Sequence, residues 1–275
     1  MKNIVDIDFL KGKMKNKSVV IFDVRHKLED KAYGEYEYDK GHIPSAIFMP
    51  FEILVDNEIA RHGGRHPLPD MDVFAKEINE MGVDDSIDVV VYDDGDYSMA
   101  GRLWFMLKLI GKENVYILKN GINAWVEEKN TMELIPNLGN KGGVLSIDYK
   151  NHLLVSIDEI KNAISSQNTV IVDSRAEERY KGIHEPIDKI AGHIPSAVNY
   201  PWMDVLEYSD ASMEELNQYY EALSDFEDIV LYCGSGITAT VNMIFLEEAG
   251  YKPRLYSGGF SDWISYEENE IACEL

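Results

Sequence analysis

Short runs of β-branched and apolar residues alternate with longer amphipathic stretches along both halves of the chain. In the first half, the runs at 19–23, 89–92 and 115–118 have the length and composition of buried strands. The stretches at 72–81 and 99–110 carry apolar residues at helical spacing. Strands that alternate with helices predict βαβ units. We therefore expect an α/β fold, with a mainly parallel sheet and helices on both of its faces.

Four short motifs occur twice, in the same order, in the two halves of the chain. They pair Val20–Arg25 with Val170–Arg175, Gly41–Ala46 with Gly192–Ala197, Val89–Asp93 with Ile229–Cys233, and Gly121–Trp125 with Gly259–Trp263. This period is too long for a solenoid, so each copy is expected to be a domain. Residues 136–143 have the glycine and asparagine content of a linker. We place the boundary near residue 147, which gives an N-terminal domain at 1–146 and a C-terminal domain at 147–275.

Cys233 stands directly after the strand pattern 229–232 and before a glycine-rich loop that leads into a helical pattern. Ligands of parallel sheets bind beyond the carboxyl ends of the strands. Backbone N–H groups of such a loop, together with a helix N-terminus, favour the thiolate form of a cysteine. The pattern therefore indicates a nucleophilic sulfur. The alternative is a small buried hydrophobic residue at a strand end.

The first half has Asp93 at the position that matches Cys233. A carboxylate cannot replace a thiolate as a sulfur nucleophile, so we expect the N-terminal domain to be catalytically silent. Both copies keep the Asp-x-Arg and Gly-His-Ile-Pro motifs, although only one copy has the cysteine. We therefore interpret those shared motifs as scaffold.

Charge and composition mainly exclude certain partners, a disulfide framework and a secretory signal. The chain has 26 Lys and Arg against 49 Asp and Glu, a formal charge of −23, which argues against nucleic acid and membrane surfaces as partners. Its two cysteines make a disulfide framework implausible. Asp6 and Asp8 interrupt the first apolar stretch, which does not resemble a secretory signal. We expect a cytoplasmic protein, and the absence of metal-ligand spacing or a nucleotide-binding loop implies no cofactor.

Two copies of Asp-x-Arg followed by Gly-His-Ile-Pro, with Cys-Gly-Ser-Gly-Ile-Thr-Ala in the second half, resemble the tandem-domain rhodanese sulfurtransferases. The resemblance covers nearly the whole chain. It implies two tandem rhodanese-like domains, of which the C-terminal one is active, with Cys233 carrying sulfur as a persulfide. The implied reaction moves a sulfane sulfur from a small anionic donor to an acceptor thiol, such as thioredoxin or a low-molecular-weight thiol, or to cyanide in the test tube.

The loop is similar to that of the 3-mercaptopyruvate sulfurtransferases. Thiosulfate sulfurtransferases typically place Arg and Lys directly after the cysteine, where this chain has Gly234 and Ser235. The resemblance implies that the Ser235 hydroxyl handles the substrate carbonyl and that Arg179 binds the anionic group of the donor. It also implies that backbone N–H groups surround the transferred sulfur, from a loop made of Gly234, Ser235, Gly236, Ile237, Thr238 and Ala239.

The chain departs from the mercaptopyruvate branch at Ile187, which follows Glu185-Pro186 where that branch has a second arginine. Lys189 is the nearest replacement, but it offers a point charge rather than a fork. The preferred donor therefore stays open between 3-mercaptopyruvate and thiosulfate.

The same branch sets a histidine and an acid against the loop serine. His66 matches the histidine, and Glu52 is the closest match for the acid, with Asp56 as the second choice. His66 also belongs to a cationic cluster in an acidic chain, together with Arg61, His62 and Arg65. That cluster either steers anionic donors or is a solvated loop.

Two other classes of function compete with this interpretation. Protein phosphatases that share the fold need a longer loop ending in arginine, and this chain has Ala239-Thr240 there. Duplicated rhodanese domains also become non-catalytic binding or regulatory modules, a fate usually marked by loss of the nucleophile, whereas Cys233 is retained. The second cysteine, Cys273, is close to the chain end and is interpreted as incidental.

Overall fold

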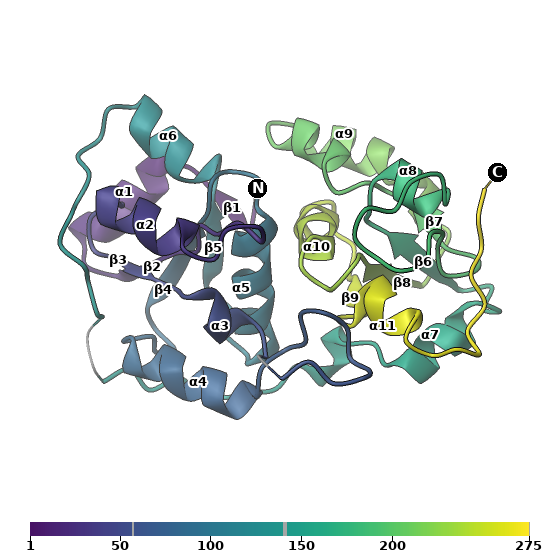
Figure 1. Cartoon of the computed structure of the whole chain (residues 1–275). Coiled ribbons are helices and arrows are strands. Elements are labelled where there is room, and N and C mark those ends of the chain that lie inside the picture. Colours follow the sequence, from purple (N-terminus) through teal and green to yellow (C-terminus); the bar gives the residue numbers. More distant parts are fainter. Residues whose placement is uncertain (57, 140–141, 275) are drawn as a thin grey trace. The chain divides into compact units, whose positions relative to one another are not determined.

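The computed structural model describes residues 1–56, 58–139 and 142–274. The chain divides into two compact units (Figure 1). The first comprises Met1–Asn57 and Leu68–Lys150, and the second comprises Glu58–Pro67 and Asn151–Leu275. This division differs in two ways from the boundary placed near residue 147: it falls at residue 150, and the segment 58–67 belongs to the second unit. Residues 140 and 141 of the expected linker lie outside the described residues.

The first unit contains a five-stranded parallel sheet in the order β1-β5-β4-β2-β3. Its elements are β1 (Ile4–Val5), α1 (Ile7–Lys15), β2 (Val19–Asp23), α2 (Tyr33–Lys40), β3 (Ala46–Phe48), α3 (Phe51–Leu54), α4 (Met71–Glu80), β4 (Asp88–Tyr92), α5 (Ser98–Leu109), β5 (Val115–Leu118) and α6 (Gly121–Glu127). Apolar side chains of α1, α2 and α6 pack with one face of the sheet in a single core. Figure 1 shows α5 on the other face.

The second unit contains a four-stranded parallel sheet in the order β7-β6-β8-β9. Its elements are a 3₁₀ turn η1 (Asn151–Leu153), α7 (Ile157–Ala163), β6 (Thr169–Asp173), α8 (Glu177–Tyr180), β7 (Val198–Asn199), η2 (Asp204–Tyr208), α9 (Met213–Tyr219), η3 (Glu221–Leu223), β8 (Asp228–Tyr232), α10 (Ala239–Glu248), β9 (Arg254–Leu255) and α11 (Gly259–Trp263). The core on one face joins α7, α8 and α11 to the sheet, and α10 lies on the other face (Figure 1).

The predicted α/β fold class is confirmed, and the individual elements lie close to their predicted positions. The strands expected at 19–23 and 115–118 have those bounds, and the helices expected at 72–81 and 99–110 each begin and end one residue earlier. The shift of α4 has a local cause, because Asp70 caps the helix by accepting hydrogen bonds from the N–H groups of Asp72 and Val73. Among the described residues, no helix has the length and apolar content needed to cross a membrane.

The Asp-x-Arg motif has the same structural task in each unit. In the second unit, Arg175 Nη2 donates to Asp173 at 2.6 Å and to the carbonyl of Gly192, in the Gly-His-Ile-Pro turn, at 2.6 Å. Asp23, Arg25 and Gly41 repeat this arrangement in the first unit. A buried arginine whose charge is paired and whose donors are used fixes a turn against a strand end. This is the geometry expected of a scaffold.

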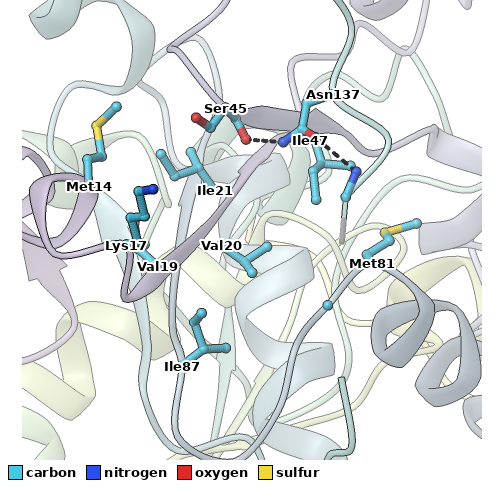
Figure 2. A pocket seen from close by; sticks show the side chains of 12 residues that line it. Met14, Lys17, Val19, Val20, Ile21, Ser45, Ile47, Met81, Ile87 and Asn137 are labelled. Atoms are coloured by element: carbon cyan, nitrogen blue, oxygen red, sulfur yellow. Dashed lines mark hydrogen bonds between the residues drawn. The ribbon is translucent and has the colours of Figure 1, made fainter. Parts of the chain in front are cut away.

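A cavity of about 360 Å³ lies in the first unit, between the end of α1, the starts of β2 and β4, and β3 (Figure 2). Met14, Lys17 and Met81 are among the residues that line it, and Asn137 Nδ2 donates to the carbonyl of Ser45 at 2.5 Å at its edge. It includes the amino ends of the strands, whereas ligands of parallel sheets bind at the carboxyl ends. The position of this cavity therefore does not suit a ligand site of a parallel sheet.

Candidate active site

Cys233 follows the last residue of β8 and opens the loop into α10. Two hydrogen bonds attach this loop to α11, because Phe260 N donates to the carbonyl of Cys233 at 2.8 Å and Ser261 N donates to that of Gly234 at 3.0 Å. Gly236 has a φ of 75°, and a Cβ there would lie 2.1 Å from the Ser257 carbonyl oxygen. Only glycine fits that position. The loop therefore has one fixed shape, which holds a cysteine that is 2% exposed.

The amide groups of this loop are available to a ligand. Among the described residues, the N–H groups of Ser235, Ile237 and Thr238 have no acceptor in the protein. They lie directly before the first turn of α10, where the helix dipole is positive. Such an arrangement suits an anion that reaches the loop from outside.

A segment from the first half of the sequence completes this unit. We call residues 58–67 the strap. It is attached to α11 and the residues just after it by Gly63 N to Asp262 Oδ1 (2.6 Å), Arg65 N to Ser261 Oγ (3.1 Å), His62 Nδ1 with Ser265 Oγ (2.7 Å), and stacking of the His62 ring on Tyr266. The strap is thus bound to the same helix that holds the Cys233 loop, although Arg61 in it is 72% exposed, and its role in steering donors stays a prediction.

His66 and Ser235 are brought together as the sequence resemblance implied. A hydrogen bond of 2.7 Å joins His66 Nδ1 to Ser235 Oγ, and the serine is buried. Glu52, the expected acid, belongs to α3 of the first unit and is exposed. There, burial lowers the pKa of His26, and the negative charge of Glu52 acts against that effect. Its role beside His66 stays a prediction.

Two arginines lie over the residue after the cysteine. A Cβ on Gly234 would lie 2.8 Å from Arg65 Nη2 and 3.5 Å from Arg179 Nη2, so both guanidinium groups are close to the loop backbone. Arg179 donates through Nε to both oxygens of Glu185 and through Nη2 to Asp188 at 2.8 Å. Arg65 Nη1 pairs with the other oxygen of Asp188. One buried carboxylate therefore bridges the two arginines.

The electrostatic environment of that carboxylate is mixed. Burial raises the pKa of Asp188, and the positive charges of Arg65 and Arg179 act in the opposite direction. Asp188 stands in no motif that predicts a site, and Arg65 was predicted only as one member of a cationic cluster. The available signal was the position of Arg65 directly before His66.

Lys189, the expected replacement for the missing second arginine, is exposed. Its side chain makes no ion pair or hydrogen bond with any other described residue. Its role in donor binding stays a prediction, whereas the structure places Arg65 and Arg179 at Gly234.

The matching loop in the first unit is filled from within. The Asp93 carboxylate accepts hydrogen bonds from the N–H groups of Gly95 (2.9 Å), Tyr97 (3.3 Å) and Ala100 (3.0 Å). Burial raises the pKa of Asp93 to about 7, with a further contribution from the charge of Asp96, although the three N–H groups lower it. Gly95 and Tyr97 stand two and four residues after Asp93, as Ser235 and Ile237 do after Cys233, so these two amides are open in the second unit and occupied by the protein's own side chain in the first.

Comparisons with known proteins agree with this duplicated architecture. The model of the rhodanese-like domain matches residues 6–128 and again residues 156–266. The chain is 33% identical over 279 residues to a probable 3-mercaptopyruvate sulfurtransferase of Pseudomonas aeruginosa, covering 96% of this chain and 95% of the relative. It is 32% identical over 255 residues to the putative thiosulfate sulfurtransferase SseB of Mycobacterium tuberculosis, covering 90% and 88%.

A solved structure gives the same result for the fold. The crystal structure of SseA from Escherichia coli, described as a 3-mercaptopyruvate sulfotransferase with the rhodanese fold, has a TM-score of 0.82 with 27% identity, and the match covers 95% of this chain and all of that one. These relatives are named as sulfurtransferases, which argues against the alternatives of a phosphatase and of a non-catalytic module. The chain belongs to the rhodanese family, as a sulfurtransferase with two rhodanese-like domains.

Proposed function

We propose that the protein takes a sulfur atom from 3-mercaptopyruvate and passes it to a thiol through a persulfide on Cys233. The observation that carries this proposal is the hydrogen bond between His66 and Ser235, in a loop that has no Arg or Lys in the two positions after Cys233. A ketone-bearing donor needs a hydrogen-bond donor at its oxygen. The names of the relatives from Pseudomonas aeruginosa and Escherichia coli support the same donor.

In the first half-reaction, the Cys233 thiolate attacks the sulfur of 3-mercaptopyruvate. A sulfur–sulfur bond forms, the carbon–sulfur bond breaks, and the electron pair leaves on pyruvate as its enolate, which then takes up a proton. Negative charge develops on the former ketone oxygen. The Ser235 hydroxyl donates a hydrogen bond to that oxygen, and His66 supports the serine as a proton donor and acceptor.

The open amides of the loop serve the persulfide. Its outer sulfur extends one bond beyond Cys233 Sγ and is readily ionised, and the N–H groups of Ser235, Ile237 and Thr238 provide donors for that charge. Gly234, Gly236 and Ala239 complete the backbone of this cradle, as the family resemblance implied.

In the second half-reaction, an acceptor thiolate attacks the outer sulfur of the persulfide. The sulfur–sulfur bond breaks, the acceptor leaves as a persulfide, and the Cys233 thiolate returns. Thioredoxin and low-molecular-weight thiols are the proposed acceptors, and cyanide serves in an assay. These thiols are abundant in a reducing compartment such as the cytoplasm, which is where we propose that the enzyme works.

The remaining assignments follow the same scheme. Arg179 binds the donor carboxylate through Nη1, because its Nε and Nη2 already donate to Glu185 and Asp188, and Lys189 is a secondary candidate for that task. Glu52 is the proposed acid partner of His66. The N-terminal domain is silent because Asp93 fills its loop and supplies no sulfur.

The alternative donor is thiosulfate, which the name of the Mycobacterium tuberculosis relative favours. Steady-state assays with both donors distinguish the two. We expect 3-mercaptopyruvate to be the faster donor, and Ser235→Ala to lower its turnover by about 10- to 100-fold while sparing thiosulfate, which has no ketone oxygen. A clear preference for thiosulfate, or an equal loss with both donors, would overturn the donor assignment.

A further inference from the structure

Arg65 brings a cation to the Cys233 loop from a distant part of the sequence. Its partner Asp188 lies 123 residues away along the chain, and the side chain of Asp188 is only 2% exposed. The backbone of Arg65 is fixed separately, because its N–H donates to Ser261 Oγ on α11. The position of this guanidinium group is therefore set at two points.

Arg65 and Arg179 each have a hydrogen-bond donor that is unused and lies near Gly234. Among the described residues, Arg65 Nη2 and Arg179 Nη1 have no acceptor in the protein. A Cβ on Gly234 would lie 2.8 Å from the first atom and 3.8 Å from the second. Since Gly234 is the neighbour of Cys233, the anionic end of a bound donor has these two donors within reach.

The charged side chains near Gly234 have no net charge in the absence of a donor. Arg65 and Arg179 carry two positive charges, and Glu185 and Asp188 carry two negative charges in direct contact with them. The side chain of Arg179 is 14% exposed and that of Arg65 is 31% exposed, so solvent screens the pairs only in part. A donor that adds one negative charge disturbs this balance less than a donor that adds two.

We propose that Arg65 is a second donor-binding arginine and that Asp188, by bridging Arg65 and Arg179, restricts this pair to donors with a single negative charge. The inference rests on the proposed function, and it names the residues that select the donor. At neutral pH 3-mercaptopyruvate carries one carboxylate charge, whereas thiosulfate is a dianion. Asp188 thereby supplies selectivity that the loop sequence alone does not.

The test compares kcat/KM for the two donors in the wild type and in Asp188→Asn, which removes one negative charge at nearly constant shape. We expect thiosulfate kcat/KM to rise about tenfold and that of 3-mercaptopyruvate to change much less. Arg65→Gln should raise KM about tenfold for both donors with a smaller change in kcat, because it removes ground-state binding. Asp228→Asn, which disturbs the ion pair with Arg254 in the same unit, is the matched control and should leave the donor ratio unchanged.

A second measurement needs no variant and so does not depend on the folding of Asp188→Asn. Pyruvate, a monoanion, should inhibit the wild type more strongly than sulfate, a dianion, when 3-mercaptopyruvate is the varied substrate. An active Asp188→Asn variant with an unchanged ratio of kcat/KM for the two donors would overturn this inference alone. So would a wild type that sulfate inhibits as strongly as pyruvate does. A wild type that transfers sulfur from neither donor would overturn the proposed function, and this inference with it.

Discussion

At the scale of single residues, two glycines of the Cys233 loop have different tasks. Gly236 is required by its backbone, because its φ is positive and a carbonyl oxygen lies where a Cβ would be. Gly234 has no such backbone constraint, and its missing side chain instead leaves room for the Arg65 guanidinium. One glycine therefore shapes the loop, and the other makes space for binding.

These tasks predict that substitution by alanine weakens donor binding at Gly234 but lowers stability at Gly236. Gly234→Ala should push the flexible end of Arg65 aside, raising KM for the donor about five- to tenfold with little change in stability. Gly236→Ala should lower the free energy of unfolding by about 1–3 kcal/mol, because the strained backbone and its close carbonyl cannot yield. Urea unfolding and steady-state kinetics on both variants check this. Equal destabilisation by the two changes would contradict the assignment.

The hydrogen bond between His66 and Ser235 leads to a further prediction for single residues. His66→Ala should lower kcat with 3-mercaptopyruvate by about 100-fold, because the serine loses the group that exchanges protons with it. Turnover of thiosulfate, which develops no enolate, should fall much less. If His66→Ala lowered both rates equally, the imidazole would have only a structural role.

At the scale of elements, α11 is the platform of the site. Its first residues bind the carbonyls of Cys233 and Gly234, and the side chains of Ser261 and Asp262 bind the strap. The helix is short, but it joins two segments that are far apart in the sequence. The relative position of the loop and the strap therefore depends on a few hydrogen bonds.

Loosening the strap should consequently weaken donor binding without abolishing the chemistry. The double variant Ser261→Ala, Ser265→Ala removes the side-chain acceptor for Arg65 N and the partner of His62. We expect faster amide hydrogen exchange in residues 62–66 and a rise in KM of a few-fold. Ser224→Ala, at the exposed residue that follows η3, is the control. Unchanged exchange in the strap would show that other contacts hold it.

Much of this organisation could be predicted from local sequence, because its causes are local. Runs such as Val19–Asp23 predict strands through β-branched composition, and the loop after Cys233 predicts its own shape through its glycines. The pairing of His66 with Ser235 came from a family motif. The bridge from Arg65 to Asp188 and the transfer of the strap to the second unit join distant segments. No periodicity or spacing reports such contacts.

At the scale of the whole molecule, the duplication produced one open loop and one filled loop. In the part of the chain that the structure describes, the N–H groups of Ser235 and Ile237 have no acceptor, whereas the matching N–H groups of Gly95 and Tyr97 donate to the Asp93 carboxylate. The same backbone design therefore leaves amides open to a ligand in one copy and pairs them with an internal carboxylate in the other. The filled copy retains a buried acid with an unusual pKa.

That acid should give the chain a measurable pH dependence of stability. The pKa of Asp93 in the folded protein is raised to about 7 from the ordinary value of 3.8. Folded protein therefore holds this proton more tightly than unfolded protein, and the free energy of unfolding should fall as the pH rises from about 4 to 7. The loss is at most about 4 kcal/mol.

Urea unfolding at pH 5 and pH 8 tests this sign. Asp93→Asn should remove the part of the fall in the free energy of unfolding that Asp93 causes. Asp96→Asn should make that part smaller, because the charge of Asp96 contributes to raising the pKa of Asp93. A variant with the same pH dependence as the wild type would show that Asp93 is ionised in the folded protein throughout this range.

The most direct test of the whole account is the mass of Cys233 after incubation of the full-length protein with 3-mercaptopyruvate alone. We predict an increase of about 32 Da, one sulfur atom, on the peptide that contains Cys233, and its removal by an added thiol. The Cys233→Ser variant should gain no such mass and transfer no sulfur. Sulfur found only on Cys273, or full activity in Cys233→Ser, would contradict the account.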